Sequence, residues 1–182
     1  LYITFILKSA AVMTYLTAKP PELTELTSAD ADSLAAKDVV HWALDLDLWK
    51  MEDISKYMTA YSADPGQSII KEYHQGTFMA VIITGIVDIL KQDSLGKQKI
   101  IASLGPGKII GEMGLIDGEP RSASAHARTR TTILVLTQSD FERLSAQQPR
   151  LALELSIKLA KISSRRLRRT SGRLIEYLPK AS

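Results

Sequence analysis

The chain of 182 residues has 45% hydrophobic residues and a formal net charge of +3. This length fits one buried domain with appended helices and excludes two large domains. A net charge this small gives no basis by itself for nucleic-acid binding. The absence of cysteine excludes disulfides, thiolate metal sites and a thiol nucleophile, and it is compatible with a reducing cytoplasm, where we expect the protein.

The first 16 residues, LYITFILKSAAVMTYL, are apolar but are interrupted by Lys8. They are fewer than the ~20 residues that a membrane-spanning helix needs, and they lack the basic start and small-residue cleavage site of a secretory signal. Three interpretations stay open: residues upstream of a start at Met13, an amphipathic helix that packs on a partner, or the end of a membrane segment. No firm membrane segment is predicted.

Paired prolines and small polar residues over 18–30 indicate a loop. A helix is expected after it, with Ser28 or Asp30 as its N-cap. The apolar face of this helix would consist of Leu34, Val39, Trp42 and Leu46. We group residues 1–57 as an N-terminal segment with a loop and helices.

From residue 58 the pattern changes to short apolar runs separated by glycine and proline. DPGQSII predicts a turn and a short strand, and TFMAVIITGIVDILKQ predicts two strands that meet at Gly85. Further strands are expected in GKQKIIASL, GPGKIIG, SASAHARTR and TTILVLT. This spacing predicts an α+β protein: an antiparallel β-roll or jelly-roll barrel over residues 58–148, flanked by N-terminal helices and a long C-terminal helix.

The last part of the chain is helical. Ser139 is the expected N-cap of a short helix, with Glu142 as its capping-box partner, and Pro149 opens a long helix over 149–179. Gly172 weakens the last turns of that helix. Apolar residues recur at helical spacing: Leu151, Leu155, Leu159, Ile162, Leu167, Leu174 and Leu178. The stripe predicts either a coiled-coil-like homodimer or packing on the chain's own barrel.

The stretch GEMGLIDGEPRSASA carries the chemistry of a small-anion site. Gly111 and Gly114 would let a ligand approach backbone N–H groups, and Arg121 offers a planar, two-pronged donor for phosphate oxygens. Glu112 would repel phosphate, so its use is to accept hydrogen bonds from sugar hydroxyls. From the residues alone, a sugar-phosphate site and a glycine-rich corner with a surface Glu–Arg pair both remain possible.

The order and spacing of this stretch resemble the phosphate-binding cassette of cyclic nucleotide-binding domains. The segment DPGQSIIKEYHQGTFMAVIITGIVDI is similar to the earlier strands of that family, although Tyr73 stands where many members have glycine. The resemblance covers residues 59–178. It implies a β-roll that binds a cyclic nucleotide.

The resemblance implies a role for each cassette residue. It assigns Glu112 to the ribose 2′-hydroxyl and Arg121 to the cyclic phosphate. Backbone N–H groups near Gly114 and Ala123 and the Ser122 hydroxyl would complete the phosphate cage. The predicted cassette residues are Gly111, Glu112, Met113, Gly114, Arg121, Ser122 and Ala123.

SRRLRRTSGRL resembles the long helix of catabolite activator proteins, in which a Thr-Ser pair contacts adenine and the dimer partner supplies one of the two contacts. Thr170 and Ser171 match that pair, and a pair of solvated helix residues is the alternative interpretation. Guanine-preferring members often have threonine after the cassette arginine, where this chain has Ser122, so cAMP is expected over cGMP. The resemblance also implies a homodimer through this helix.

Basic residues concentrate on the same helix. They are Lys161, Arg165, Arg166, Arg168, Arg169 and Arg173, with Lys180 beyond them. Such a cluster occurs in nucleic-acid and lipid binding, but basic residues interspersed with leucine and serine on one helix more often form a solvated face or pair with the ligand and acidic residues.

The expected function is a cytoplasmic sensor that binds a cyclic nucleotide and signals by repositioning its C-terminal helix. His41, His74 and His126 are scattered, which predicts no metal site, no catalytic residues and no enzyme activity. The alternatives are the effector domain of a Crp/Fnr-like transcription regulator or the regulatory domain of a channel or transporter. A helix-turn-helix is not expected within this sequence, so DNA binding by this chain as given is not expected.

Overall fold

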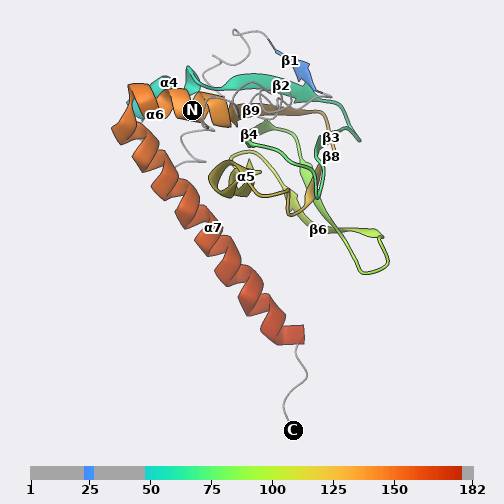
Figure 1. Ribbon diagram of the computed structural model, residues 1–182. Helices are drawn as coiled ribbons and strands as arrows, with labels where there is room; N and C mark the ends of the chain where they lie inside the picture. Colours follow the sequence, from blue (N-terminus) through green and yellow to red (C-terminus); the bar gives the residue numbers. More distant parts are fainter. Residues whose placement is uncertain (1–22, 27–47, 178–182) are drawn as a thin grey trace, which may run out of the picture.

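The computed structural model describes residues 23–26 and 48–177 (Figure 1). The strands are β1 (Thr24–Glu25), β2 (Thr59–Ala63), β3 (Ser68–Ile70), β4 (Phe78–Thr84), β5 (Val87–Gln92), β6 (Gln98–Leu104), β7 (Ile109–Ile110), β8 (Ser124–Ala127) and β9 (Thr131–Thr137). The helices are α4 (Leu48–Ser55), α5 (Glu112–Asp117), α6 (Gln138–Gln147) and α7 (Pro149–Tyr177). The predicted helix that contains Trp42 and the apolar first 16 residues lie outside the described residues.

Two antiparallel sheets pack face to face. Their strand orders are β1-β2-β9-β4-β7 and β3-β8-β5-β6. Alternate side chains of β4, namely Phe78, Ala80 and Ile82, face the second sheet, which contributes Ile70 and Val87 to the shared core. The predicted α+β jelly roll is confirmed, with the described strands arranged as a sandwich of two sheets and not as one closed barrel.

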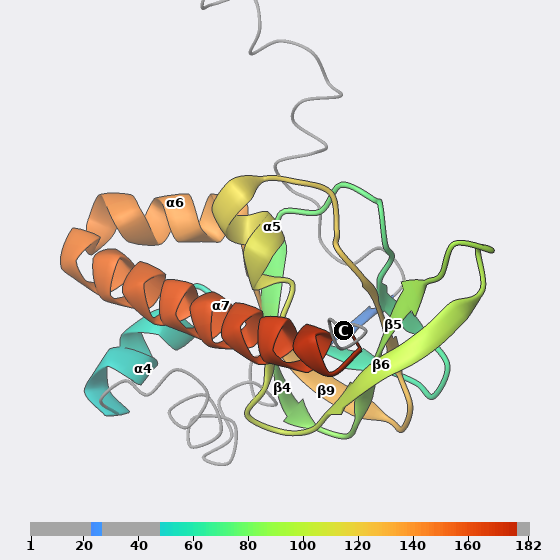
Figure 2. The ribbon, with the colours of Figure 1, turned by 90° about the horizontal axis from the view of Figure 1, so that it is seen from below.

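The opposite face of the first sheet is covered by helices. Met79, Val81 and Leu134 point to that side and pack with Leu144 of α6 and Leu155 of α7. Figure 2 shows α4, α6 and the first half of α7 together on this face. The central strands are therefore apolar on both faces, which explains why FMAVIIT and TTILVLT have no polar alternation.

The chain crosses from the first sheet to the second at Gly85, between β4 and β5. Gly85 has φ 83°, and a Cβ there would lie 2.4 Å from the carbonyl oxygen of Arg130. A side chain is excluded by both the backbone conformation and the contact. The predicted corner between two strands is confirmed.

The N-cap of α6 is Thr137, and the prediction of Ser139 is wrong. Thr137 has the extended backbone of the end of β9, with φ −81° and ψ 164°, and its Oγ1 accepts from the N–H of Asp140 at 3.2 Å. Ser139 already lies inside the helix and bonds to the Thr137 hydroxyl at 2.9 Å. The cap therefore forms where the extended strand ends, two residues earlier than predicted.

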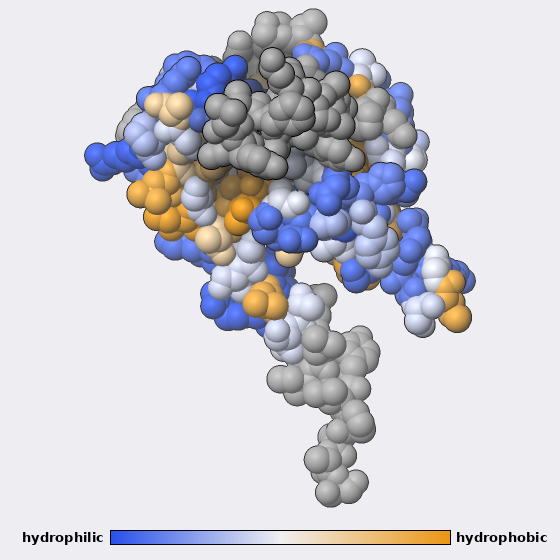
Figure 3. All heavy atoms as spheres, viewed as in Figure 1, coloured by the Kyte–Doolittle hydropathy of each residue, from blue (hydrophilic) through white to orange (hydrophobic). Residues whose placement is uncertain are grey.

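The apolar residues of α7 fall on two faces. Leu151, Leu155 and Leu159 are buried in the chain's own core, whereas Leu153, Ile157 and Leu167 are 61%, 45% and 68% exposed. Leu167 was predicted on the same stripe as Leu155, but twelve residues at ~100° each turn it by about a third of a circle. Figure 3 shows apolar side chains gathered over the first half of α7. The helix thus has a second apolar face, which the described part of the chain leaves exposed.

Candidate functional site

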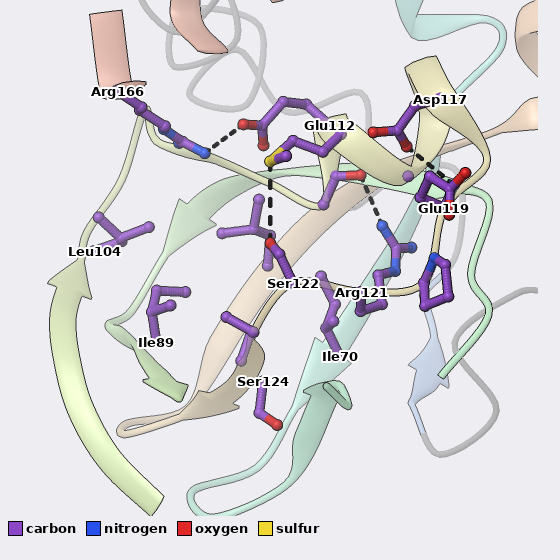
Figure 4. Close-up of a pocket in the computed structure, with 17 residues that line it drawn as sticks. Ile70, Ile89, Leu104, Glu112, Asp117, Glu119, Arg121, Ser122, Ser124 and Arg166 are labelled. Carbon is purple, nitrogen blue, oxygen red and sulfur yellow. Dashed lines mark hydrogen bonds and ion pairs between the residues drawn. The ribbon is translucent and has the colours of Figure 1, made fainter. Parts of the chain in front are cut away.

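A cavity of about 160 Å³ opens between α5, the loop after it and the second sheet. Glu112 and Arg121 both line it, together with Gly114, Ser122 and Ala123. Figure 4 shows Glu112 and Arg121 on different sides of this space, with apolar side chains of the sheet as its floor. The cavity therefore presents one carboxylate and one guanidinium over an apolar surface.

Arg121 is held as a buried cation. The residue is 5% exposed, and its NH1 and NH2 donate to the carbonyls of Gly111 and Phe78, each at 2.7 Å. Its guanidinium carbon lies 4.5 Å from the centroid of the Phe78 ring. Burial lowers the pKa of Arg121 to about 10, against the opposing charges of Glu112 and Asp117, so the side chain stays charged at neutral pH.

Arg121 is paired mainly with neutral groups. No carboxylate within residues 23–26 and 48–177 forms an ion pair with it. Carbonyl oxygens and an aromatic face satisfy the geometry of the guanidinium but leave its charge uncompensated by direct contact. Such a cation is suited to a bound anion.

Three glycines make room for this guanidinium. A Cβ would lie 2.6 Å from Arg121 Nε if added at Gly76, 2.7 Å from NH1 at Gly111 and 3.0 Å from NH1 at Gly114. Gly111 also has φ 74°, in the left-handed region. The sequence predicted that Gly111 and Gly114 allow a ligand to approach the backbone, and the structure adds that they admit the arginine.

Glu112 is 2% exposed and is the first residue of α5. Its Oε1 accepts from Arg166 NH1 of α7 at 2.6 Å, and Arg166 NH2 also donates to the carbonyl of Ile109. Arg166 lines the cavity opposite Arg121 (Figure 4). The ion pair connects the long helix to the site.

Sequence reasoning did not assign Arg166 to the site. The sequence does contain a signal for Arg166, because positions 155, 159, 162 and 166 follow the helical spacing of the stripe that packs on the chain's own core. The Arg166 side chain is itself 42% exposed, and its long stem lets the guanidinium reach a buried acidic group beneath the helix. Glu112, 54 residues earlier, is that group.

Thr170 and Ser171 are exposed residues of α7. They lie one turn beyond Arg166 and are not among the residues that line the cavity. Met113 is 48% exposed at the cavity, with its Sδ 4.0 Å from the Ser122 hydroxyl. The structure thus brings the cassette residues together and leaves the Thr-Ser pair of this chain at a distance from them.

Tyr73, the departure from the family pattern, adopts φ 66°. This is the left-handed conformation that glycine adopts without strain. The Tyr73 N–H donates to the carbonyl of Arg121 and the Arg121 N–H donates to the carbonyl of His74, both at 2.9 Å. These two hydrogen bonds therefore join the Tyr73 turn to the cassette backbone at Arg121.

The described residues contain neither a metal-site candidate nor a membrane-spanning helix. No group of three or more His, Asp or Glu side chains there could hold a metal ion. Within the same residues, each helix is too short or too polar to cross a membrane.

Residues 62–148 match the family model described as the cyclic nucleotide-binding domain. The match includes α5, residues 118–123 that follow it (the cavity turn) and the strands beneath them. Residues 62–148 therefore belong to the cyclic nucleotide-binding domain family. The resemblance predicted from the cassette is confirmed.

Solved structures agree with this family. A cyclic nucleotide-binding domain from Methylobacillus flagellatus is similar with a TM-score of 0.79 and 27% identity, over 92% of this chain and 97% of that one. The catabolite activator protein of Thermus thermophilus has a TM-score of 0.66 and 27% identity, over 75% of this chain and 62% of that one.

Curated relatives include regulators and a channel. The cyclic AMP receptor protein of Thermus thermophilus is 35% identical over 96 residues, 53% of this chain and 44% of the relative. A cyclic nucleotide-gated potassium channel of Mesorhizobium japonicum is 32% identical over 100 residues, 55% of this chain and 26% of the relative. A CRP-like cAMP-activated global transcriptional regulator of Mycobacterium tuberculosis is 26% identical over 125 residues, 69% of this chain and 54% of the relative. The chain spans about half or less of the length of these relatives.

Proposed function

We propose that the cyclic nucleotide-binding domain binds cAMP in the cavity lined by Glu112 and Arg121, without turning it over. The observation that carries the proposal is that one cavity holds both a buried carboxylate, Glu112, and a buried cation, Arg121, which has no ion-pair partner among the described residues. The cyclic phosphate would bind Arg121, the N–H groups near Gly114 and Ala123, and the Ser122 hydroxyl. The ribose 2′-hydroxyl would donate to Glu112.

The proposed output is movement of α7. Arg166 joins this helix to Glu112, so a ligand bonded to the same carboxylate alters what holds the helix near the site. The nucleotide shifts the helix only by its differential affinity for the two positions. Contact between Arg166 and Glu112 supports this coupling.

We further propose a homodimer through α7. Its second apolar face carries Leu153, Ile157 and Leu167, which are all exposed. Together with Ala160 and Ser164, these residues follow the alternating four- and three-residue spacing of a coiled-coil seam. A partner helix on this face would bring its own Thr170-Ser171 pair toward the adenine. This arrangement accounts for a Thr-Ser pair that lies away from the cavity of its own chain.

We propose the division 1–57, 58–148 and 149–179, with the β-roll as the binding unit and the long helix as hinge and dimer seam. The names of the relatives support two settings: the effector domain of a cAMP-activated regulator, and the regulatory domain of a channel. We propose that the cyclic nucleotide site lies in the cytoplasm in either setting. Cyclic AMP is favoured over cGMP because Ser122, and not threonine, follows the cassette arginine.

Calorimetry with cAMP and cGMP tests this proposal. Arg121→Ala is expected to weaken both ligands at least a hundredfold, since the loss of one partner of a buried charge pair corresponds to ~3–5 kcal/mol. Thr170→Ala/Ser171→Ala is expected to weaken cAMP more than cGMP. Equal affinities for the wild type and all variants would contradict the roles proposed for Arg121, Thr170 and Ser171. Formation of AMP from cAMP would contradict binding without turnover.

A further inference from the structure

A lysine of β5 is hydrogen-bonded to the cavity turn on the side that faces away from the cavity. Lys91 Nζ donates to the backbone carbonyl of Ser122 at 2.7 Å and to Glu72 Oε1 at 2.9 Å. Ser122 and Ala123 line the cavity, whereas Lys91 and Glu72 do not. The ammonium group therefore fixes the turn without occupying the space for a ligand.

Glu72 anchors the lysine. Its side chain is 3% exposed, its Oε2 accepts from the N–H of Gln92 at 3.0 Å, and its own N–H donates to the Ser124 hydroxyl at 3.0 Å. Burial alone would raise the pKa of Glu72, but hydrogen bonds from Lys91 and Gln92, the charge of Lys91 and a hydrogen bond from Tyr73 outweigh it and lower the pKa. At neutral pH the pair is thus a carboxylate and an ammonium group.

We propose that Lys91 is a positioning residue for anion binding, and that it acts by orienting the peptide between Ser122 and Ala123. In a planar trans peptide the C=O and the N–H point in opposite directions. Because Lys91 holds the carbonyl of Ser122 on the outer side, the N–H of Ala123 is directed to the cavity side. An N–H held in this way is ready to donate to a phosphate oxygen. The inference rests on the proposed function, since the anion in question is the cyclic phosphate.

Removal of the ammonium group has a specific consequence. Glu72 Oε1 and the Ser122 carbonyl oxygen both accept from the same nitrogen, so without it two electron-rich oxygens face each other and repel. The peptide then turns away and the N–H of Ala123 loses its direction. If Glu72 becomes protonated, its O–H donates to the carbonyl of Ser122 and replaces part of the lost contact.

Lys91→Met and the matched control Lys97→Met test this positioning role. Lys97 is an exposed residue of the β5–β6 turn, so the control removes the same charge from the same hairpin. Calorimetry with cAMP at about pH 7.5 and about pH 5.5 is the assay. Affinities are given as ratios to the wild-type protein at each pH, which cancels the pH effects that the variant and the wild type share.

Lys91→Met is expected to weaken cAMP about tenfold at the higher pH and about threefold at the lower pH, while Lys97→Met stays within twofold at both. A Lys91→Met affinity within twofold of the control, or the same loss at both pH values, overturns the positioning role. If Lys91→Met does not fold, Lys91→Gln replaces it, with the same sign of pH dependence and a smaller loss. If the wild-type protein does not bind cAMP, the proposed function is contradicted. If the wild type binds cAMP and the Lys91 variant binds it equally well, only this inference is contradicted.

Discussion

Gly111→Ala perturbs the position of Arg121 without changing a polar group. Gly111 has φ 74°, a left-handed backbone conformation that costs a residue with a side chain ~1–2 kcal/mol of conformational strain. The new Cβ would lie 2.7 Å from Arg121 NH1 and 2.9 Å from the carbonyl oxygen of Phe78, so the guanidinium has to move. It then loses its two hydrogen bonds, which contribute ~1.5 kcal/mol each because the donor is charged. The free energy of unfolding should fall by about 4 kcal/mol in all.

Gly118→Ala is the matched control for this substitution. Gly118 ends α5 with φ 70°, and a Cβ there would meet nothing within 4 Å, so only the backbone strain of ~1–2 kcal/mol applies. Urea unfolding compares the two variants, and titration with cAMP follows. Gly111→Ala should weaken cAMP at least tenfold, and Gly118→Ala should not. Equal stability losses and equal affinities would refute the link between Gly111 and Arg121.

Three further predictions concern the cap, an acidic group and the proposed dimer. Thr137→Ala should lower the free energy of unfolding by ~1 kcal/mol and Ser139→Ala by less than half of that, measured by urea unfolding; the reverse order would restore Ser139 as the cap. Burial alone would raise the pKa of Asp88, but hydrogen bonds from Arg128 and Ser103 outweigh it and hold the pKa below 3.8. The pKa of Asp88 is lower in the folded than in the unfolded protein, so its stabilisation is present above about pH 4 and is lost as the pH falls further. The midpoint of thermal unfolding of Asp88→Asn should therefore change less between about pH 6 and pH 3 than that of the wild type. An equal change in both proteins would contradict this. Ile157→Lys should keep the fold and convert a dimer to a monomer in sedimentation velocity, and a wild-type monomer at high concentration with bound cAMP would contradict the dimer.

The fold follows from local patterns that the sequence displays. Gly85 marks the corner between sheets because the backbone conformation and the close carbonyl there admit only glycine. Apolar runs without alternation identify strands that are covered on both faces, as β4 and β9 are. The cassette could be recognised because its residues are close together in sequence and its chemistry requires both their types and their spacing.

Contacts between distant segments could not be read in the same way. The pair of Arg166 with Glu112 joins residues 54 positions apart, and the contact of Lys91 with Ser122 joins residues 31 apart. Only the fold brings such residues together, and a basic side chain on a helix or a strand more often faces solvent. The cap of α6 was misplaced for a related reason, since the end of β9 sets where the helix begins.

A double-mutant cycle between protein and ligand tests the central claim most directly. Calorimetry compares cAMP with 2′-deoxy-cAMP on the wild-type protein and on Glu112→Ala. If Glu112 accepts the ribose hydroxyl while Arg121 holds the phosphate, deletion of the hydroxyl weakens binding to the wild type ~10- to 100-fold, which matches ~1.5–3 kcal/mol for a hydrogen bond to a charged group. The same deletion should then have almost no effect on Glu112→Ala. An equal loss on both proteins would contradict the proposed binding mode.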